Sequence, residues 1–277
     1  MNVTDALAAG AAALPQRGGI PDPHREAMWL LAAAWGVDEI TLRLHPERDV
    51  PLEVAQRFRS WVERRAGGEP AHHLTGSCPF WGREFEVSSA VLVPRPETEL
   101  IIEVALSLPL TSNARVLDVG TGSGCIATTL AVERPGWLVA AVDRKLPAAV
   151  VALGNMRRFG LDGRLWIGDL ATAVGPPWDL IVANLPYVPT ADISRLSPEV
   201  RRDPRSALDG GPDGLDLVRR LLADLPRLLR PCGGAVLEIG DQQAEGVADL
   251  AGESGLAVAR RVRDVSGCER VIVLQTR

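Results

Sequence analysis

The residues best suited to chemistry are four consecutive side chains, Asn184, Leu185, Pro186 and Tyr187. They follow an apolar run, residues 180–183, that is typical of a buried parallel strand. An asparagine directly after such a strand lies where open α/β sheets bind their ligands. Pro186 fixes its own φ and favours extended geometry at Leu185, so this turn can hold one side-chain amide and one backbone carbonyl at set positions. Taken alone, the pattern is equally compatible with a plain strand-end turn.

A second group of candidate residues lies upstream, in a glycine-rich loop that follows another apolar run and precedes a helix. The loop residues are Asp118, Gly120, Thr121, Gly122, Ser123 and Gly124. Glycines let the backbone approach a ligand closely. A dinucleotide fingerprint would need glycine at position 125, where Cys125 stands. The loop therefore suits a nucleoside without a pyrophosphate.

Two further acids follow the next two strands. Asp143 can accept two hydrogen bonds from vicinal ribose hydroxyls. Asp169 could accept one from an adenine amino group, with Leu170 against the ring. Each acid alone has an ordinary alternative as a helix cap or a solvated loop residue. Because the carboxyl ends of parallel strands share one edge of a sheet, we expect both acids, the glycine loop and Asn184 to line one crevice.

These residues require a sheet to position them. Strands are predicted at 115–119, 138–142, 165–167, 179–183, 235–239, 256–262 and 270–274. Helices are predicted between them at 124–133, 147–159, 214–229 and 241–253. This alternation predicts an α/β fold with a mostly parallel sheet and helices on both faces. The final two strands are separated by a turn and could be antiparallel.

The N-terminal part of the chain follows a different pattern. Apolar side chains at helical spacing predict three helices, at 6–14, 25–35 and 52–66. The resulting bundle is either a packing cap or a docking module for a partner, and we favour docking. Residues 80–87 and 91–93 predict a β-hairpin, and we expect His72 and His73 just before it to be surface or linker residues. The predicted domains are 1–72 (helical substrate docking), 73–95 (hairpin linker) and 96–277 (catalytic).

Composition and charge limit the classes of protein to which the chain can belong. The chain has 277 residues, 46% hydrophobic and 23% charged, which is ordinary for one large or two modest globular domains. Its four cysteines lack zinc-ligand spacing, so we expect no metal site and reduced thiols in a cytoplasmic protein. No apolar run reaches membrane-spanning length, and the net charge of -5 gives no support to a nucleic-acid partner.

Together these residues resemble the class I S-adenosylmethionine-dependent methyltransferase fold, a Rossmann-like, mostly parallel seven-stranded sheet. Within that fold, the chain is similar to the protein-(glutamine-N5) methyltransferases of the HemK/PrmC family, which modify peptide chain release factors. The likeness covers nearly the whole chain and rests on the helical N-terminal part and on segments 80–85, 93–99, 118–124, 184–187 and 204–211. The Arg-Pro-Glu-Thr-Glu segment and the Asn-x-Pro-Tyr turn are specific in combination, whereas the glycine loop alone is not.

The resemblance implies roles for the two groups of residues. Asn184, Leu185, Pro186 and Tyr187 would be catalytic. The glycine loop with Asp118, together with Asp143, Asp169, Leu170 and Asn184, would hold S-adenosylmethionine. The Asn184 oxygen and the Leu185 carbonyl would each accept one hydrogen of the glutamine amide in a Gly-Gly-Gln motif. The family's usual tetrapeptide is Asn-Pro-Pro-Tyr, so Leu185 keeps the carbonyl but gives up rigidity.

Two other interpretations remain open at the level of sequence. An adenine-N6 methyltransferase acting on DNA or RNA could use the same turn, because an exocyclic amino group has the same conjugated geometry as an amide. A non-catalytic binder could dock a partner through the helical bundle and keep only a vestigial cofactor site. The intact glycine loop, Asp143 and Asn184 argue against such decay.

Overall fold

The computed structural model describes residues 1–15 and 20–276, which form two compact units. The helical unit comprises Met1–Ser77 and Arg195–Asp203, and the sheet unit comprises Cys78–Ser194 and Pro204–Arg277. Residues 16–19 of the predicted docking domain and Arg277 of the predicted catalytic domain lie outside the described residues. The boundaries proposed from sequence, 72/73 and 95/96, stay predictions.

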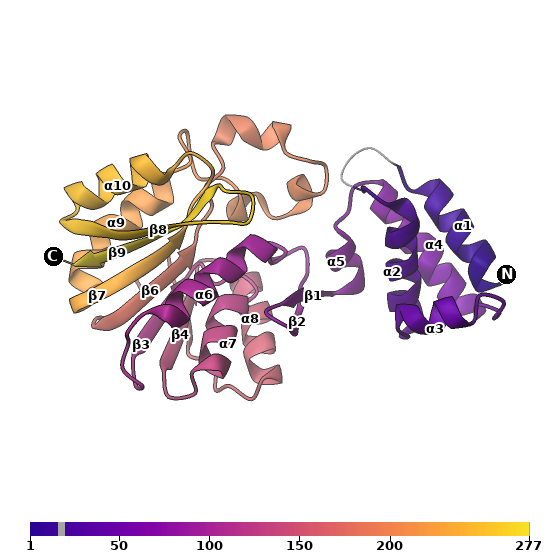
Figure 1. The fold of residues 1–277 in the computed structure, drawn as a ribbon, viewed down its shortest axis with the longest axis horizontal. Helices are drawn as coiled ribbons and strands as arrows, with labels where there is room; N and C mark the ends of the chain where they lie inside the picture. The colour runs from indigo at the N-terminus through magenta and orange to yellow at the C-terminus, as the bar shows by residue number, and fades with distance from the viewer. Residues whose placement is uncertain (16–19, 277) are drawn as a thin grey trace. The chain divides into compact units, whose positions relative to one another are not determined.

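The helical unit contains the three helices that the apolar spacing predicted, and two short ones that it did not. They are α1 (Val3–Ala13), α2 (Pro23–Trp35), α3 (Glu39–Leu44), α4 (Leu52–Ala66) and α5 (Ala71–Thr75) (Figure 1). Asp22 caps α2 by accepting hydrogen bonds from the backbone of His24 and Arg25, and Gly36 ends the helix with φ 73°. Because α3 and α5 span fewer than two turns, periodicity could not reveal them.

The surface position expected for the two adjacent histidines was wrong. Both lie in α5, where the ring of His72 packs edge-on against Trp29, with 5.0 Å between ring centroids. The His73 side chain is only 3% exposed, and its Nε2 lies 3.7 Å from the buried carboxylate of Asp203. The expectation failed because Asp203 is remote in sequence and meets α5 only in the folded unit.

Residues 195–203 contact the helices through side chains that include Arg65 and Arg202. The Arg65 side chain is 3% exposed and binds Glu26 at 2.5 Å and Glu199 at 2.8 Å. Arg202, in the 3₁₀ turn η3 (Val200–Arg202), donates to the Gly67 carbonyl at 3.0 Å. A buried arginine needs such partners, so these contacts fix the segment on the helices.

The sheet unit contains the mostly parallel sheet that the sequence predicted. Its strands are β3 (Arg115–Val119), β4 (Leu138–Asp143), β5 (Leu165–Ile167), β6 (Trp178–Asn184), β7 (Leu229–Glu238), β8 (Leu256–Arg263) and β9 (Glu269–Thr276). They follow the order β5-β4-β3-β6-β7-β9-β8. Among the described strands of this sheet, only β9 runs antiparallel to its neighbours β7 and β8, so the final pair is antiparallel, as the sequence allowed.

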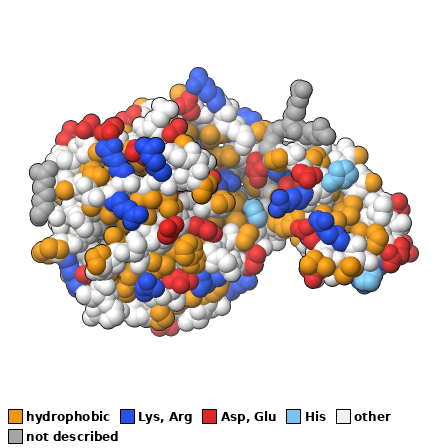
Figure 2. Space-filling model, viewed as in Figure 1, with side chains coloured by type: hydrophobic (Ala, Val, Ile, Leu, Met, Phe, Trp, Pro, Cys, Tyr) orange, Lys and Arg blue, Asp and Glu red, His pale blue; other side chains and the backbone are white. Residues whose placement is uncertain are grey.

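Charged side chains are mixed on the surface. On the face drawn in Figure 2, Lys and Arg side chains lie among Asp and Glu side chains, with hydrophobic and neutral ones between them. Within residues 1–15 and 20–276, no helix combines the length and apolar character needed to cross a bilayer.

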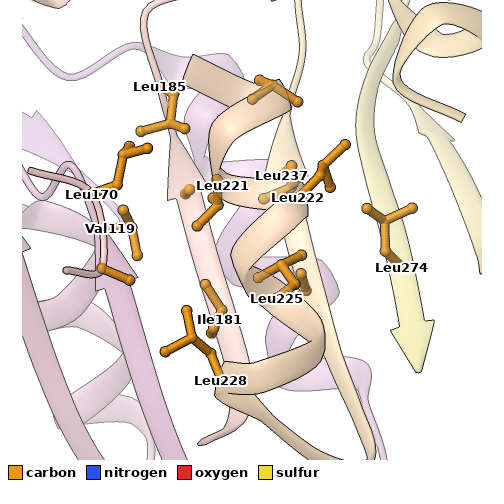
Figure 3. Packing of buried hydrophobic residues seen from close by; sticks show 14 of the residues in the cluster. Val119, Leu170, Ile181, Leu185, Leu221, Leu222, Leu225, Leu228, Leu237 and Leu274 are labelled. Atoms are coloured by element: carbon orange, nitrogen blue, oxygen red, sulfur yellow. The ribbon is translucent and has the colours of Figure 1, made fainter. Parts of the chain in front are cut away.

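Helices cover both faces of the sheet because alternate residues of its central strand point in opposite directions. Ile181 belongs to a buried cluster with Leu221 and Leu225 (Figure 3). The neighbouring Leu180 belongs to a second cluster, with Ile102. The covering helices are α6 (Glu99–Ser107), α7 (Cys125–Glu133), α8 (Leu146–Arg158), α9 (Asp216–Leu228) and α10 (Ala244–Glu253).

A hairpin exists, but it lies earlier in the chain than predicted, because the predicted first strand, 80–87, contains its turn and its second strand. It pairs β1 (Ser77–Phe80) with β2 (Arg83–Glu86) through a tight turn at Trp81 and Gly82, whose φ angles are 51° and 68°. Residues 91–93 are not a strand. Their apolar character reflects burial instead, since Val91 and Val93 are both 2% exposed in a cluster with Ala148.

Candidate active site

A cleft of about 980 Å³, part of it open to solvent, lies at the carboxyl ends of β3, β4 and β6 in the sheet unit. Its lining includes ten residues proposed from sequence: Gly120, Thr121, Gly122, Ser123, Asp143, Asp169, Leu170, Asn184, Leu185 and Pro186. Three others, Asp118, Gly124 and Tyr187, lie outside the lining. Arg95 and Thr98, from the segment before α6, also line it.

Asp118 lies beneath the glycine loop. Its side chain is fully buried, and its Oδ2 accepts hydrogen bonds from the Thr121 hydroxyl at 2.6 Å and the Ala127 backbone at 3.2 Å. Burial raises the pKa of Asp118 to about 7, although both hydrogen bonds lower it. Asp118 therefore shapes the loop from below. Gly124 has φ 78° and contacts Ala152 so closely that a Cβ there would lie 3.0 Å from it.

Asp143 occupies the end of β4, beside the loop. Its Oδ2 accepts from the Gly122 backbone at 2.9 Å, and its Oδ1 accepts from the Lys145 backbone at 2.8 Å. A carboxylate has about four acceptor positions, so each oxygen can still accept a second hydrogen bond from a ligand in the cleft.

Asp169 and Leu170 follow β5. Asp169 forms a 2.6 Å ion pair with Arg220 of α9, in which both side chains are largely exposed. Leu170 adopts φ 51°, which is uncommon for a branched residue. Its side chain is 8% exposed and belongs to the same apolar cluster as Val119 and Leu185 (Figure 3). Leu170 thus gives the cleft an apolar wall over the sheet.

Leu185 is held by burial, which offsets the missing proline. Its side chain is 4% exposed, and a Cβ on Gly120 would lie 3.0 Å from its Cδ2. The chain after it is also fastened, because the Gln243 side chain donates to the Tyr187 carbonyl at 2.9 Å. Val188 exchanges backbone hydrogen bonds with Leu208 and Gly210, each at 2.9 Å. The turn is therefore supported from both sides.

Asn184 lines the cleft, and its side chain reaches the segment before α6. Its Nδ2 donates to the Thr98 hydroxyl at 3.1 Å. Behind this pair lies Glu238, 2% exposed at the end of β7, whose Oε1 accepts from the Tyr187 hydroxyl at 3.4 Å. Burial raises the pKa of Glu238 to about 7 and, with the nearby carboxylate, the pKa of Tyr187 to about 12.

Sequence reasoning missed Thr98 and Glu238. The acids on either side of Thr98 are ordinary for a helix start, which left the threonine itself without a role. Glu238 did carry a signal, because it interrupts an apolar run, Ala235–Ile239, that predicts a buried strand. A carboxylate inside such a run is costly to bury and often marks a functional site.

Known proteins resemble this fold. Two family models match the chain, the PrmC N-terminal domain over residues 5–76 and the methyltransferase small domain over residues 97–206. A solved methyltransferase from Pyrococcus furiosus aligns with a TM-score of 0.55 and 19% identity, covering 71% of this chain and 89% of its own. Fold and cleft thus define a Rossmann-like methyltransferase.

Sequence relatives identify the family within this class of methyltransferases. The release factor glutamine methyltransferase of Rhodospirillum rubrum is 41% identical, covering 94% of this chain and 81% of the relative. That of Cereibacter sphaeroides is also 41% identical and covers 98% of both chains. The chain therefore belongs to the release factor glutamine methyltransferase family.

Proposed function

We propose that this protein, acting in the cytoplasm, transfers a methyl group from S-adenosylmethionine to the side-chain amide nitrogen of the glutamine in the Gly-Gly-Gln motif of peptide chain release factors. One observation carries the proposal. Asn184 lines the cleft at the end of β6 with its Nδ2 committed to Thr98, so its Oδ1 remains to accept a hydrogen bond from a substrate. An amide hydrogen is a fitting donor to that oxygen.

The cleft suits the proposed cofactor. Gly120 and Gly122 have φ 76° and 56°, so the loop presents backbone without side chains to a ligand. Asp143 offers acceptor positions for ribose hydroxyls, and Leu170 offers an apolar wall to a flat ring. Asp169 would accept from the adenine amino group. Bound in this way, S-adenosylmethionine would supply an electrophilic methyl group on a sulfonium.

The protein's task is to orient a weak nucleophile. The lone pair of an amide nitrogen is delocalised, so the nitrogen attacks only when it is aimed well. Asn184 Oδ1 and the Leu185 carbonyl would each accept one amide hydrogen, which also stabilises the positive charge that grows on nitrogen. Such orientation can contribute on the order of 7 to 11 kcal/mol in favourable cases. No strong base is needed, because the nitrogen becomes acidic only as the methyl group arrives.

Pro186 and Tyr187 would support this grip. Pro186 fixes the turn, and Tyr187 is fastened through its carbonyl to Gln243 and through its hydroxyl to Glu238. Residues 204–214 would form a substrate cradle, since Pro204, Ser206 and Ala207 line the cleft. We assign the docking of the release factor to the helical unit.

The proposal is tested by incubating the protein with methyl-labelled S-adenosylmethionine and either purified release factor or adenine-containing DNA and RNA. We expect label in the release factor alone. Label in adenine would instead establish the nucleic-acid methyltransferase. Cofactor that binds without transfer to either substrate would establish a non-catalytic binder.

A further inference from the structure

We propose that Thr98 and Glu238 are positioning residues that decide which end of the Asn184 side-chain amide faces the cleft. The inference rests on the proposed function, because the orientation of Asn184 matters only if its oxygen must accept a hydrogen bond from the substrate. Neither residue needs to touch the reacting atoms. Their effect would pass through Asn184.

The two ends of an asparagine amide have nearly the same shape and opposite hydrogen-bonding character. If Asn184 turned by half a rotation, its NH2 group would face the NH2 group of the substrate, and no hydrogen bond could form between them. Packing alone distinguishes these orientations poorly. A polar partner must therefore select one of them.

Thr98 is the partner that contacts Asn184. It is 3% exposed, and its Oγ1 lies 3.1 Å from Asn184 Nδ2. A hydroxyl can donate one hydrogen bond and also accept. Thr98 alone could therefore satisfy either end of the amide, by accepting from Nδ2 or by donating to Oδ1. Something else has to fix the direction of the threonine proton.

Glu238 fixes that direction. Its side chain is 2% exposed, and the Thr98 side chain is the polar neighbour that lowers its pKa most. An ionised carboxylate only accepts, so the Thr98 proton goes to Glu238 and the Thr98 oxygen is left to accept from Asn184 Nδ2. The Tyr187 hydroxyl also donates to Glu238, at 3.4 Å. Because Tyr187 acts as a donor there, it does not compete with Glu238 for the Thr98 proton. The oxygen of Asn184 is thereby directed to the cleft.

The relay works only while Glu238 is ionised. Four groups act on it from the elements packed around it: Thr98 and Glu97 of η1 (Pro96–Thr98), Tyr187 after β6, and Arg270 on β9. Burial dominates and raises the pKa of Glu238 to about 7, against the lowering effects of Thr98, Arg270 and Tyr187. A protonated carboxyl can donate to Thr98, which frees the threonine proton for Asn184 Oδ1. We therefore expect kcat to fall as pH drops below about 7.

Substitutions at Thr98 separate positioning from packing. Thr98→Val removes the hydroxyl and keeps the shape, whereas Thr98→Ser keeps the hydroxyl. We expect Thr98→Val to lower kcat by about 10- to 100-fold, the range for partners that orient catalytic ligands. The KM for release factor and the Kd for S-adenosylmethionine should not change, and Thr98→Ser should restore kcat. The control is Thr129→Val, at a buried threonine on α7 whose hydroxyl has no hydrogen-bond partner among the described residues.

Glu238→Gln tests the other half of the relay and does not depend on the stability of the Thr98 variants. An uncharged amide at 238 does not titrate, so kcat at saturating cofactor should be flat across the pKa of about 7. Saturation matters because Asp118 also has a pKa of about 7 and supports the cofactor loop. A wild-type pH profile retained in Glu238→Gln would overturn the inference.

The Thr98 variants provide an independent test. An unchanged kcat in Thr98→Val, or an equal loss in Thr98→Ser, would also overturn the inference. If Thr98→Val fails to bind cofactor or melts early, the Glu238→Gln profile alone decides. In all of these outcomes the wild-type protein methylates release factor, so a wild type without that activity marks the failure of the proposed function instead.

Discussion

Buried charge is handled differently in the two units. In the helical unit, the buried Arg65 is paired with Glu26 and Glu199, and these contacts fasten segment 195–203. In the sheet unit, the buried Asp118 and Glu238 have mainly neutral hydrogen-bond partners, and both lie directly behind the cleft. Charges in the first unit hold the fold, whereas carboxyls in the second unit orient groups that face a substrate.

The buried carboxyls of the sheet unit and the paired carboxylate Glu69 of the helical unit should respond oppositely to pH. The pKa of Asp118, about 7, lies above its value of roughly 4 in an unfolded chain, so between these values the folded state binds the extra proton. As pH rises through this window, the free energy of unfolding of the sheet unit should fall by at most about 4 kcal/mol from Asp118. Above the window it should stay constant. Glu238 should add a smaller effect of the same sign.

The helical unit should show the reverse. A hydrogen bond from Arg64 lowers the pKa of Glu69, so its stabilising effect should be present above the unfolded value and lost as pH falls through the folded one. Hydrogen exchange with denaturant, read by mass spectrometry for peptides of each unit, measures both slopes. Asp118→Asn should flatten the slope of the sheet unit only. If the free energy of unfolding changed with pH in the same direction in both units, the proposed difference between them would be wrong.

Removing the Asn184 amide should abolish activity without loss of fold. We expect Asn184→Ala to lower kcat by about 10²- to 10³-fold or more, the cost of deleting a group that stabilises growing charge. Because the Asn184 contact lies on the substrate side, the Kd for S-adenosylmethionine by calorimetry should be largely unchanged. Steady-state kinetics on a release factor supplies kcat, and full turnover by this variant would remove the mechanism.

Arg65→Met should have the complementary effect, lowering stability without altering the cleft. It leaves Glu26 and Glu199 partly buried and unpaired, at a cost of about 3 kcal/mol. We expect faster tryptic cleavage within 195–203 and an unchanged Kd for S-adenosylmethionine.

Arg64→Met is the matched control for Arg65. Arg64 is half exposed and pairs with Glu69 at 2.8 Å, a contact of the kind that contributes about 1 kcal/mol or less. If both variants were equally resistant to trypsin, Arg65 would not be what fastens the segment.

Asp143→Ala should have the smallest effect of the series. Loss of a charged acceptor for ribose hydroxyls should weaken the binding of S-adenosylmethionine by about 1.5 to 3 kcal/mol, measured by calorimetry. The control is Asp179→Ala, whose carboxylate pairs with Arg230 at 2.9 Å near the opposite end of β6. An affinity unchanged in Asp143→Ala would show that the ribose lies elsewhere.

The sequence predicted the residues whose placement follows from topology. Asp143, Asp169 and Asn184 each follow a parallel strand, and the ends of such strands must meet at one edge. The turn between the final two strands allowed the antiparallel pairing that the structure shows. The same reasoning placed Asp118 with the cofactor residues, although its side chain points beneath the loop.

Other features depend on contacts between segments that are remote in sequence. Thr98 lies 86 residues from Asn184, and no local pattern links them. His73 meets Asp203 only after α5 and segment 195–203 have packed together. The hairpin was predicted too late in the chain for a related reason, since burial gave residues 91–93 the apolar character expected of a strand.

The most direct test of the proposed mechanism is to locate the transferred methyl group. Release factor incubated with the protein and labelled S-adenosylmethionine is digested, and tandem mass spectrometry reads the peptide that holds the Gly-Gly-Gln motif. We predict one methyl group on the side-chain nitrogen of that glutamine with the wild-type protein, and none with Asn184→Ala. A methyl group on any other residue, or equal labelling by both proteins, would contradict the idea that this turn grips a planar amide.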